Sequence, residues 1–136
     1  MGRKKVLFDI NIVIDFIDAT RENNQIVKKL IHKLILDDYK IVITEDMLST
    51  VFYIQKDKKT TLQFLKTIQE DWLIVGFGQD VIRNAIKLSL ERNLGLEDLL
   101  QCLCAKENGC EALITNDNKF YDCGMNIYTI EKFLAK

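Results

Sequence analysis

Short, unbroken runs of hydrophobic residues alternate along the chain with longer amphipathic segments. Five runs have the length and composition of strands, and they cover residues 5–10, 40–44, 72–77, 112–115 and 126–130. Strands of a parallel sheet that is covered on both faces have this continuous hydrophobic character, because neither face meets water. The runs therefore predict a central parallel sheet.

The segments between these runs have the periodicity of helices. From Ile26 to Ile35, hydrophobic residues recur every three or four positions, and lysines and His32 lie on the opposite, solvated face. Similar patterns cover 46–55, 58–70, 79–92 and 97–108. Since strands and helices alternate throughout, the predicted fold class is a three-layer α/β/α architecture around a central parallel sheet. No linker or repeat divides the sequence, so we expect one domain over residues 1–136.

The charge balance, the lengths of the hydrophobic runs and the cysteine spacing limit the binding partners and the cellular location that we expect. The 19 Lys and Arg nearly match the 20 Asp and Glu, so any contact with nucleic acid must come from a local basic patch. No hydrophobic run reaches the ~20 residues that span a bilayer, and an acid interrupts the N-terminal "MGRKKVLFDIN", so we expect a cytoplasmic protein without a membrane contact. The cysteines form no CxxC pair and have no histidine nearby, and we expect reduced, buried thiols at Cys102, Cys104, Cys110 and Cys123.

Acidic residues lie at the ends of the first and fourth predicted strands. Two more begin the helix that comes before the fourth strand. Asp9 lies near the end of the first strand, Asp117 lies just past the fourth, and Glu97 and Asp98 begin the helix. Ligands of open parallel sheets bind at the carboxyl ends of the strands. Carboxylates gathered there repel one another unless a cation intervenes, and oxygen donors suit Mg²⁺ or Mn²⁺. The pattern predicts a metal site that could hydrolyse a phosphodiester, although helix capping alone would explain Asp98.

These motifs resemble those of the PIN domain, the nuclease fold of virulence-associated protein C toxins. "LFDINIVIDF" (7–16) is similar to the family's opening strand and Asp-x-Asn, and "LEDLLQCLCAKENGCEALITNDNKF" (96–120) is similar to its second half. The resemblance implies catalytic, metal-binding roles for Asp9, Asp98 and Asp117. It also implies supporting polar roles beside the metal ligands for Asn11, Thr115 and Asn116.

The resemblance further implies an Mg²⁺- or Mn²⁺-dependent endoribonuclease, the toxin of a type II toxin-antitoxin pair. Its expected partners are an RNA substrate, a small antitoxin protein and a second copy of the chain in a homodimer. We expect RNA phosphates to contact lysines by interactions that weaken with salt, namely Lys56, Lys58, Lys59 and Lys119.

One departure from the family's pattern leaves the chemistry open. The family carries a glutamate in the helix after the second strand, where this chain has Thr50 or Val51. Glu45 or Asp46 at the start of that helix could replace it, and Glu45 is our candidate fourth ligand, although both acids also suit a helix N-terminus. The alternative is a PIN-fold module that binds RNA or protein without cleaving it.

The residue two positions after Asp9 argues against a second class of enzyme, and three further acids remain to be placed. A phosphatase of the haloacid-dehalogenase type needs Asp-x-Asp after its first strand, and Asn11 at the second position cannot donate a carboxyl proton. Three more acids are expected at the surface or behind the metal ligands: Asp15, Asp18 and Asp122.

Overall fold

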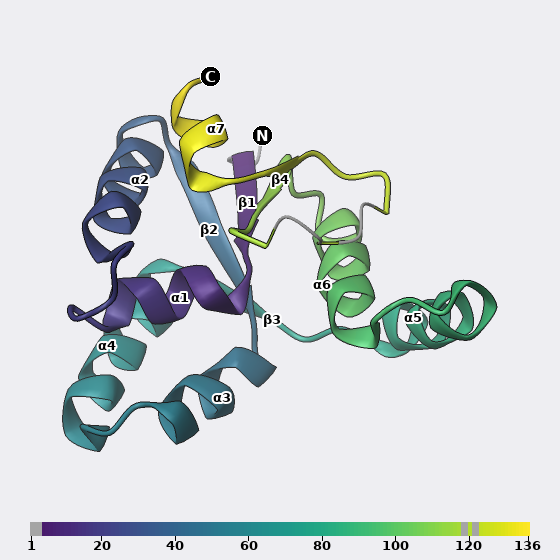
Figure 1. Cartoon of the computed structure of the whole chain (residues 1–136), viewed down its shortest axis with the longest axis horizontal. Helices are drawn as coiled ribbons and strands as arrows, with labels where there is room; N and C mark the ends of the chain where they lie inside the picture. Colours follow the sequence, from purple (N-terminus) through teal and green to yellow (C-terminus); the bar gives the residue numbers. More distant parts are fainter. Residues whose placement is uncertain (1–3, 118–119, 121–122) are drawn as a thin grey trace.

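Parallel strands form the centre of the molecule, as the hydrophobic runs predict. The structure, a computed structural model, describes residues 4–117, 120 and 123–136. Its elements in chain order are β1 (Lys4–Phe8), α1 (Ile10–Ile17), α2 (Asn24–Leu36), β2 (Tyr39–Thr44), α3 (Asp46–Ile54), α4 (Lys58–Asp71), β3 (Leu73–Val75), α5 (Gln79–Arg92), α6 (Leu96–Glu107), β4 (Ala112–Ile114), β5 (Ile127–Tyr128) and α7 (Ile130–Leu134). The strands pair in the order β3-β2-β1-β4-β5, and every pairing is parallel (Figure 1).

The strand order reverses beside β1, the central strand. β1 pairs with β2 on one side, with Val6 opposite Ile41, and with β4 on the other, with Phe8 opposite Ile114. β1 and β4 are therefore neighbours in the sheet, and their carboxyl ends lie side by side. In open parallel sheets, such a reversal leaves a crevice outside the carboxyl ends of the strands.

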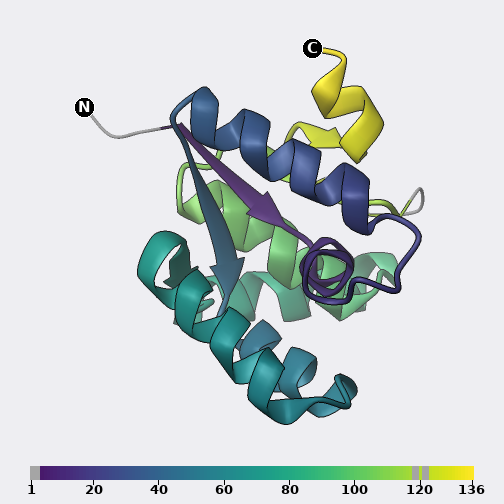
Figure 2. The ribbon, with the colours of Figure 1, turned by 90° about the vertical axis from the view of Figure 1, so that its left-hand side faces the viewer.

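Two layers of helices cover the sheet, which confirms the three-layer α/β/α prediction. Val6 and Phe8 of β1 belong to the core under α1, α2, α4 and α7, whereas Leu7 points to a second core that includes Cys102 and Ala105 of α6. This alternation follows from the two-residue period of a strand. Figure 2 shows α2 and α4 in front of the sheet and α6 behind it. α5 packs on α6 and stands away from the sheet (Figure 1).

The first and last elements differ from the sequence-based boundaries. The hydrophobic run at 5–10 contains both a strand and the start of a helix, because β1 ends at Phe8 and the Asp9 side chain caps α1. The last run, 126–130, contains only the short β5 and the beginning of α7, whose N-cap is Thr129. Among the described residues, no helix is both long enough and hydrophobic enough to cross a bilayer.

The expectation of four reduced cysteines is wrong for one pair. Cys102 and Cys123 form a disulfide, with Cα atoms 6.0 Å apart, while Cys104 and Cys110 are free and buried. The bonded cysteines are separated by 21 positions in the sequence, and they meet only because the chain after β4 folds back onto α6. The spacing of the cysteines in the sequence therefore could not predict this bond.

Candidate metal centre

Asp9 occupies the turn between the central strand and α1. Its backbone amide donates to the carbonyl oxygen of Ile114 at 3.0 Å, which continues the pairing of β1 with β4. Its carboxylate Oδ1 accepts from the Ile10 amide at 2.8 Å and caps α1. The residue is only 6% exposed. The strand thus delivers a carboxylate to the crevice edge of the sheet, where the first helix turn orients it.

A hydrogen-bond chain connects Asp9 with the end of β4. The hydroxyl of Thr115, itself buried, donates to Asp9 Oδ2 at 2.8 Å, and the Thr115 hydroxyl oxygen accepts from the Asp117 amide at 3.0 Å. Thr115 therefore fixes the Asp9 carboxylate and the backbone of Asp117 at once. Thr115 thus joins two of the acids that the sequence predicts as metal ligands, and its supporting role at a metal site stays a prediction.

Burial dominates the electrostatics of the Asp9 carboxylate. Burial raises the pKa of Asp9 from its ordinary value of 3.8, the hydrogen bonds from Thr115 and Ile10 lower it, and the nearby charge of Asp117 raises it further. Burial has the largest effect, and the pKa is raised on balance. The charge of Asp117, which is far from Asp9 in the sequence, therefore acts on the Asp9 carboxylate in the folded protein.

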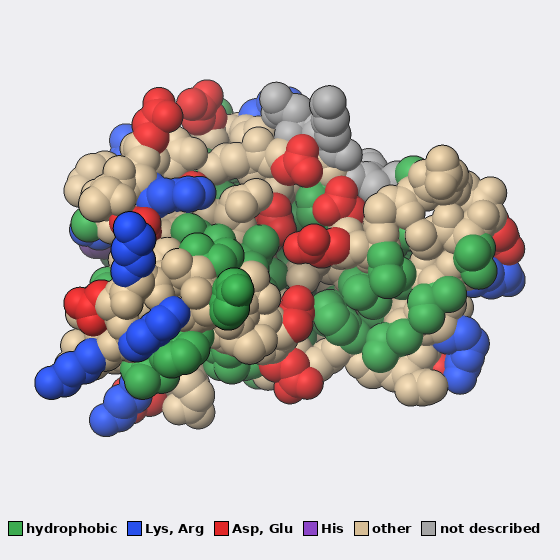
Figure 3. Space-filling view, turned by 60° about the horizontal axis from the view of Figure 1, so that its bottom comes forward, with side chains coloured by type: hydrophobic (Ala, Val, Ile, Leu, Met, Phe, Trp, Pro, Cys, Tyr) green, Lys and Arg blue, Asp and Glu red, His purple; other side chains and the backbone are tan. Residues whose placement is uncertain are grey.

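Acids from two helices extend this group. Partial burial and the charges of Asp9, Asp98 and Asp46 all raise the pKa of Glu97, in that order after burial. Glu97 and Asp98 lie in the first turn of α6, and Asp46 lies in the first turn of α3. The carboxylates of three separate elements thus act on one another. Figure 3, which brings the lower side of Figure 1 forward, shows Asp and Glu side chains gathered in the middle of this face between two hydrophobic areas.

Glu45, the predicted fourth ligand, precedes α3 and points toward β3. Its Oε1 lies 3.1 Å from the place that a Cβ on Gly76 would occupy, so its carboxylate lies over the backbone of Gly76. Thr50 and Val51 offer no replacement, because Val51 is fully buried in the core and the Thr50 hydroxyl donates to the Asp46 carbonyl. Asp46, rather than Glu45, is the α3 acid whose charge acts on Glu97.

Gln101, one turn after Glu97 and Asp98 on α6, is a buried polar residue that the sequence-based prediction did not include. It is 2% exposed, and its Nε2 donates to the hydroxyl of Thr44, at the end of β2, at 3.1 Å. Its Oε1 is buried without a hydrogen-bond partner, and a buried oxygen of this kind is an acceptor for a ligand's water or proton. The signal was available, since Gln101 lies three residues after Asp98 on the apolar side of the predicted helix.

The two asparagines that were predicted to support the metal ligands lie in different environments. Asn11 is exposed on α1, and the described bonds to the Asp9 carboxylate come from Thr115 and Ile10 instead. Asn116 is partly exposed, but its Nδ2 is buried without a hydrogen-bond partner.

Two of the three additional acids belong to local structure. Asp15 is buried, and its carboxylate accepts a hydrogen bond from Arg21 Nε at 2.9 Å. The two residues form a structural ion pair near the end of α1. Asp18 ends α1 and accepts from the amide and hydroxyl of Thr20. Asp122 lies outside the described residues, as does Lys119.

Lys58 has a role that its position in a basic run did not predict. Its ammonium donates to the carbonyls of Phe52, Tyr53 and Gln55, the last at 2.6 Å, and thereby satisfies the C-terminal carbonyls of α3. Lys56 and Lys59 are exposed beside it. The basic run thus contains one structural lysine and two that face water.

The donor set fits a hard divalent cation by its chemistry. Within the part of the chain that the structure describes, no three His, Cys, Asp or Glu side chains are arranged closely enough to ligate one ion. The charge of Asp117 nevertheless raises the pKa of Asp9, the charges of Asp9, Asp98 and Asp46 raise the pKa of Glu97, and the buried Gln101 Oε1 has no hydrogen-bond partner. Carboxylates with such oxygens are ligands for Mg²⁺ or Mn²⁺, which also retain water.

The raised pKa of Asp9 predicts how the stability of the metal-free protein depends on pH. The folded state binds the Asp9 proton more tightly than the unfolded state, so protonation favours folding. This contribution is complete below the ordinary pKa of 3.8 and is lost as the pH rises through the higher pKa of the folded state. In EDTA, we expect the free energy of unfolding of the wild type to increase relative to Asp9→Asn as the pH falls from neutrality into the acid range. Urea denaturation measures this difference, and a difference independent of pH would contradict the burial argument.

Comparisons with known proteins agree with this architecture. The sequence profile described as PIN domain matches residues 6–124. Ribonuclease VapC1 of Aquifex aeolicus (strain VF5) is 31% identical over 140 residues, which cover 100% of this chain and 97% of that protein.

Solved structures of toxin-antitoxin proteins have a similar fold. VapBC2 of Rickettsia felis, bound to a promoter DNA fragment, matches with a TM-score of 0.72 and 18% identity, over 92% of this chain and 98% of that chain. A toxin-antitoxin complex from Klebsiella pneumoniae matches with a TM-score of 0.70 and 22% identity, over 92% and 97%. VapC20 of Mycobacterium tuberculosis, a toxin that cleaves the sarcin-ricin loop, matches with a TM-score of 0.68 and 11% identity, over 88% and 95%.

Proposed function

Because the chain belongs to the PIN domain family, we propose that it is a metal-dependent endoribonuclease, the toxin of a type II toxin-antitoxin pair. One observation carries the proposal. The buried carboxylate of Asp9 lies where the strand order reverses and feels the charge of Asp117, and the charges of Asp9, Asp98 and Asp46 act together on Glu97. A fold that brings several acids to its ligand-binding edge is suited to hold a cation there.

We assign the ion to Asp9, Asp98 and Asp117, and we propose Asp46 as the fourth acid in place of Glu45. When bound, Mg²⁺ or Mn²⁺ supplies an acidified water and offsets the charge of the scissile phosphate. The chain's own residues position these groups. Thr115 holds the Asp9 carboxylate and the Asp117 amide, and the free Oε1 of Gln101 accepts a hydrogen bond from a water behind the acids.

The substrate and partners follow from the same proposal. RNA phosphates would contact the exposed Lys56 and Lys59, and Lys119 by its place in the sequence, while Lys58 supports α3. The similar structures from Rickettsia felis and Klebsiella pneumoniae are toxin-antitoxin complexes, which supports a small antitoxin protein as partner. A homodimer and a cytoplasmic location, where RNA is accessible, complete the proposal.

A cleavage assay tests the activity. Purified protein should cut RNA in Mn²⁺ or Mg²⁺, should stop in EDTA, and should recover when the metal is restored, because the carboxylates alone cannot activate water. Rising salt should slow cleavage through the loss of phosphate contacts. Cleavage that continues at full rate in EDTA would contradict the metal-dependent mechanism.

The second candidate is a PIN-fold module that binds RNA or protein without cleaving it. The absence of a glutamate at Thr50 and Val51, together with the spread of the described acids, favours it. Calorimetry separates the two functions: the module would bind RNA without Mn²⁺ and leave it intact, whereas the nuclease binds Mn²⁺ and cuts.

A further inference from the structure

We propose that Tyr53, near the end of α3, is a stacking site for an unpaired base of single-stranded RNA. The base lies on the face of the Tyr53 ring, and the exposed lysines of the turn after α3 contact the neighbouring phosphates. This inference rests on the proposed function, because it names the form of RNA that reaches the same crevice. It adds a binding residue that takes no part in holding the metal ion.

Tyr53 presents most of its aromatic ring to water. It is 86% exposed, more than any other large hydrophobic residue of the described part of the chain. The other described tyrosines have partners within the fold. Tyr39 donates to Glu111 and packs edge-on against Phe133, and Tyr128 packs against the same phenylalanine ring. The Tyr53 ring is therefore the described tyrosine that is open to a partner from outside the chain.

Lys58 holds the backbone that carries Tyr53. Its ammonium donates to the carbonyl oxygens of Phe52, Tyr53 and Gln55, the second at 3.2 Å, and lies 4.9 Å from the centre of the Phe52 ring. These bonds satisfy carbonyls that the last turn of a helix leaves unpaired. The ring thus stands on a braced helix end, and a preorganised group loses less freedom when it binds a ligand.

The surface around Tyr53 carries positive charge. Residues 53–59 contain three lysines and one acid, Asp57, which caps α4. Lys56 and Lys59 are exposed. Figure 3 shows Lys and Arg side chains around the hydrophobic area on the side of α3 and α4, next to the acids in the middle of the face. An open aromatic ring among lysines matches single-stranded nucleic acid, which joins flat bases to a chain of phosphates.

One exposed row on α3 connects Tyr53 with the candidate metal centre. Asp46, Thr50 and Tyr53 are spaced by four and then three residues, so they lie on one face of the helix, and all three are exposed. At 1.5 Å per residue, Tyr53 lies ~10 Å along the helix axis from Asp46. A strand that crosses the crevice at Asp46 can place a nearby base on Tyr53. Bases inside a duplex stay stacked on one another, so the row favours unpaired RNA.

The test measures RNA affinity without cleavage. Fluorescence anisotropy follows the binding of labelled single-stranded RNA to the wild type and to Tyr53→Ala in EDTA, which prevents metal-dependent cutting. We expect Tyr53→Ala to bind about tenfold more weakly, the loss that follows removal of one stacked base. An abasic strand with the same number of phosphates should bind equally to both proteins, because it offers no base to stack.

The chemical nature of the side chain separates stacking from a general hydrophobic contact. Tyr53→Phe keeps the ring and should bind RNA like the wild type, whereas Tyr53→Leu keeps a large hydrophobic side chain and should bind like Tyr53→Ala. Tyr53→Trp adds a reporter, whose fluorescence should fall when a base stacks on it. The native Trp72 is only 9% exposed and should respond little.

Leu90→Ala is the matched control, because Leu90 is 82% exposed on α5 and has no aromatic ring. It should keep the RNA affinity of the wild type. Equal affinity of wild type and Tyr53→Ala, or full binding by Tyr53→Leu, would overturn the stacking site alone. A change of oligomeric state in Tyr53→Ala at unchanged RNA affinity would also overturn it, because Tyr53 would then serve a protein contact.

Failure of the wild type to bind RNA would have a different meaning. The titration is therefore repeated in Ca²⁺, a hard cation that occupies oxygen sites, with the RNA checked for integrity afterwards. If the wild type binds no RNA in EDTA or in Ca²⁺, the RNA substrate itself is wrong, and the proposed function fails together with the stacking site.

Discussion

Asp98→Asn should reduce RNA cleavage at least about a hundredfold at saturating Mn²⁺, because it removes a full negative charge from the proposed metal centre. Loss of a group that merely supports a ligand costs 10- to 100-fold, and a direct ligand should cost no less. The side chain keeps its size and its place in the first turn of α6, whose N-cap is Gly95, so the substitution leaves the start of the helix largely intact. The initial rate of cleavage of a labelled RNA measures the effect.

Asp80→Asn is the matched control for this substitution. Asp80 is also an acid in the first turn of a helix, α5, but it is exposed and paired with Arg83 rather than with the acids of the crevice. The same chemical change, also in the first turn of a helix, should leave cleavage within about twofold, since an exposed pair contributes little. If Asp98→Asn and Asp80→Asn were equally active, Asp98 would not be a ligand.

Asp46→Asn and Glu45→Gln should separate the two acids at the start of α3. Asp46 contributes to the charge that raises the pKa of Glu97, whereas the Glu45 carboxylate lies over Gly76. We therefore expect Asp46→Asn to weaken Mn²⁺ binding by about tenfold or more and Glu45→Gln to change it by less than about threefold, on the scale of lost metal-site support. Calorimetric titration with Mn²⁺ measures both affinities.

These neighbours control for each other, because each substitution removes one charge from the same helix end. A uniform loss of affinity in both variants would indicate a general electrostatic effect rather than ligation. The reverse order, with Glu45→Gln the more damaging, would restore Glu45 as the fourth ligand and would require its side chain to leave Gly76.

The parts of the fold that the sequence predicted are those that depend on local period and burial. β1, β2 and β4 are buried on both faces, and their continuous hydrophobic runs identified them. The boundary between β1 and α1 was missed, because Ile12, Val13 and Ile14 are buried on a helix just as they would be on a strand. Only the capping geometry of Asp9 distinguishes the two structures.

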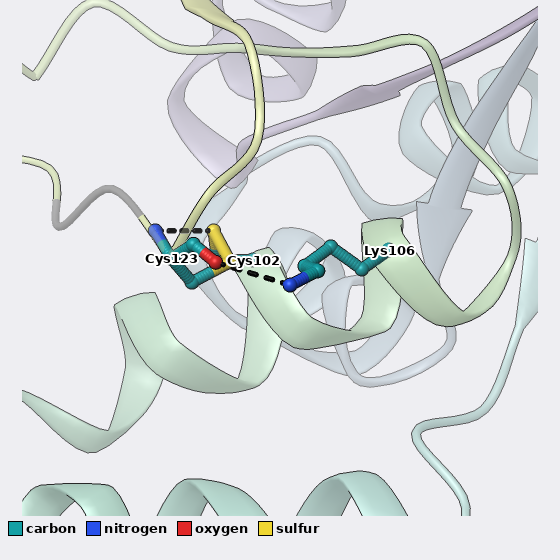
Figure 4. Close-up of a disulfide and its surroundings, with 3 residues drawn as sticks. All are labelled: Cys102, Lys106 and Cys123. Atoms are coloured by element: carbon teal, nitrogen blue, oxygen red, sulfur yellow. Dashed lines mark hydrogen bonds between the residues drawn. A yellow bond between two sulfur atoms is a disulfide. The ribbon is translucent and has the colours of Figure 1, made fainter.

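The candidate site was predictable to the same extent, because sequence patterns report topology but not the direction of individual side chains. Asp9 and Asp117 could be predicted to lie near each other because parallel strands share a carboxyl edge, and the charge of Asp117 does act on Asp9. The place of Asp98 beside them as a third ligand stays a prediction. The choice between Glu45 and Asp46 depends on which way each side chain points from the first turn of α3, and adjacent helical positions differ by about 100°. The disulfide of Cys102 with Cys123 (Figure 4) depends on how the chain returns after β4, which no local pattern records.

The three hydrogen bonds that Lys58 donates to the last carbonyls of α3 bear on any search for the RNA-contacting surface. A charge-removal scan across the basic run would score Lys58 as essential, yet its loss would fray the far end of the helix whose first turn presents Asp46. Such a variant would lose cleavage at every salt concentration, whereas loss of Lys56 or Lys59 would flatten the salt dependence. Ionic strength, rather than activity alone, therefore tells a lysine that touches the substrate from one that braces the scaffold.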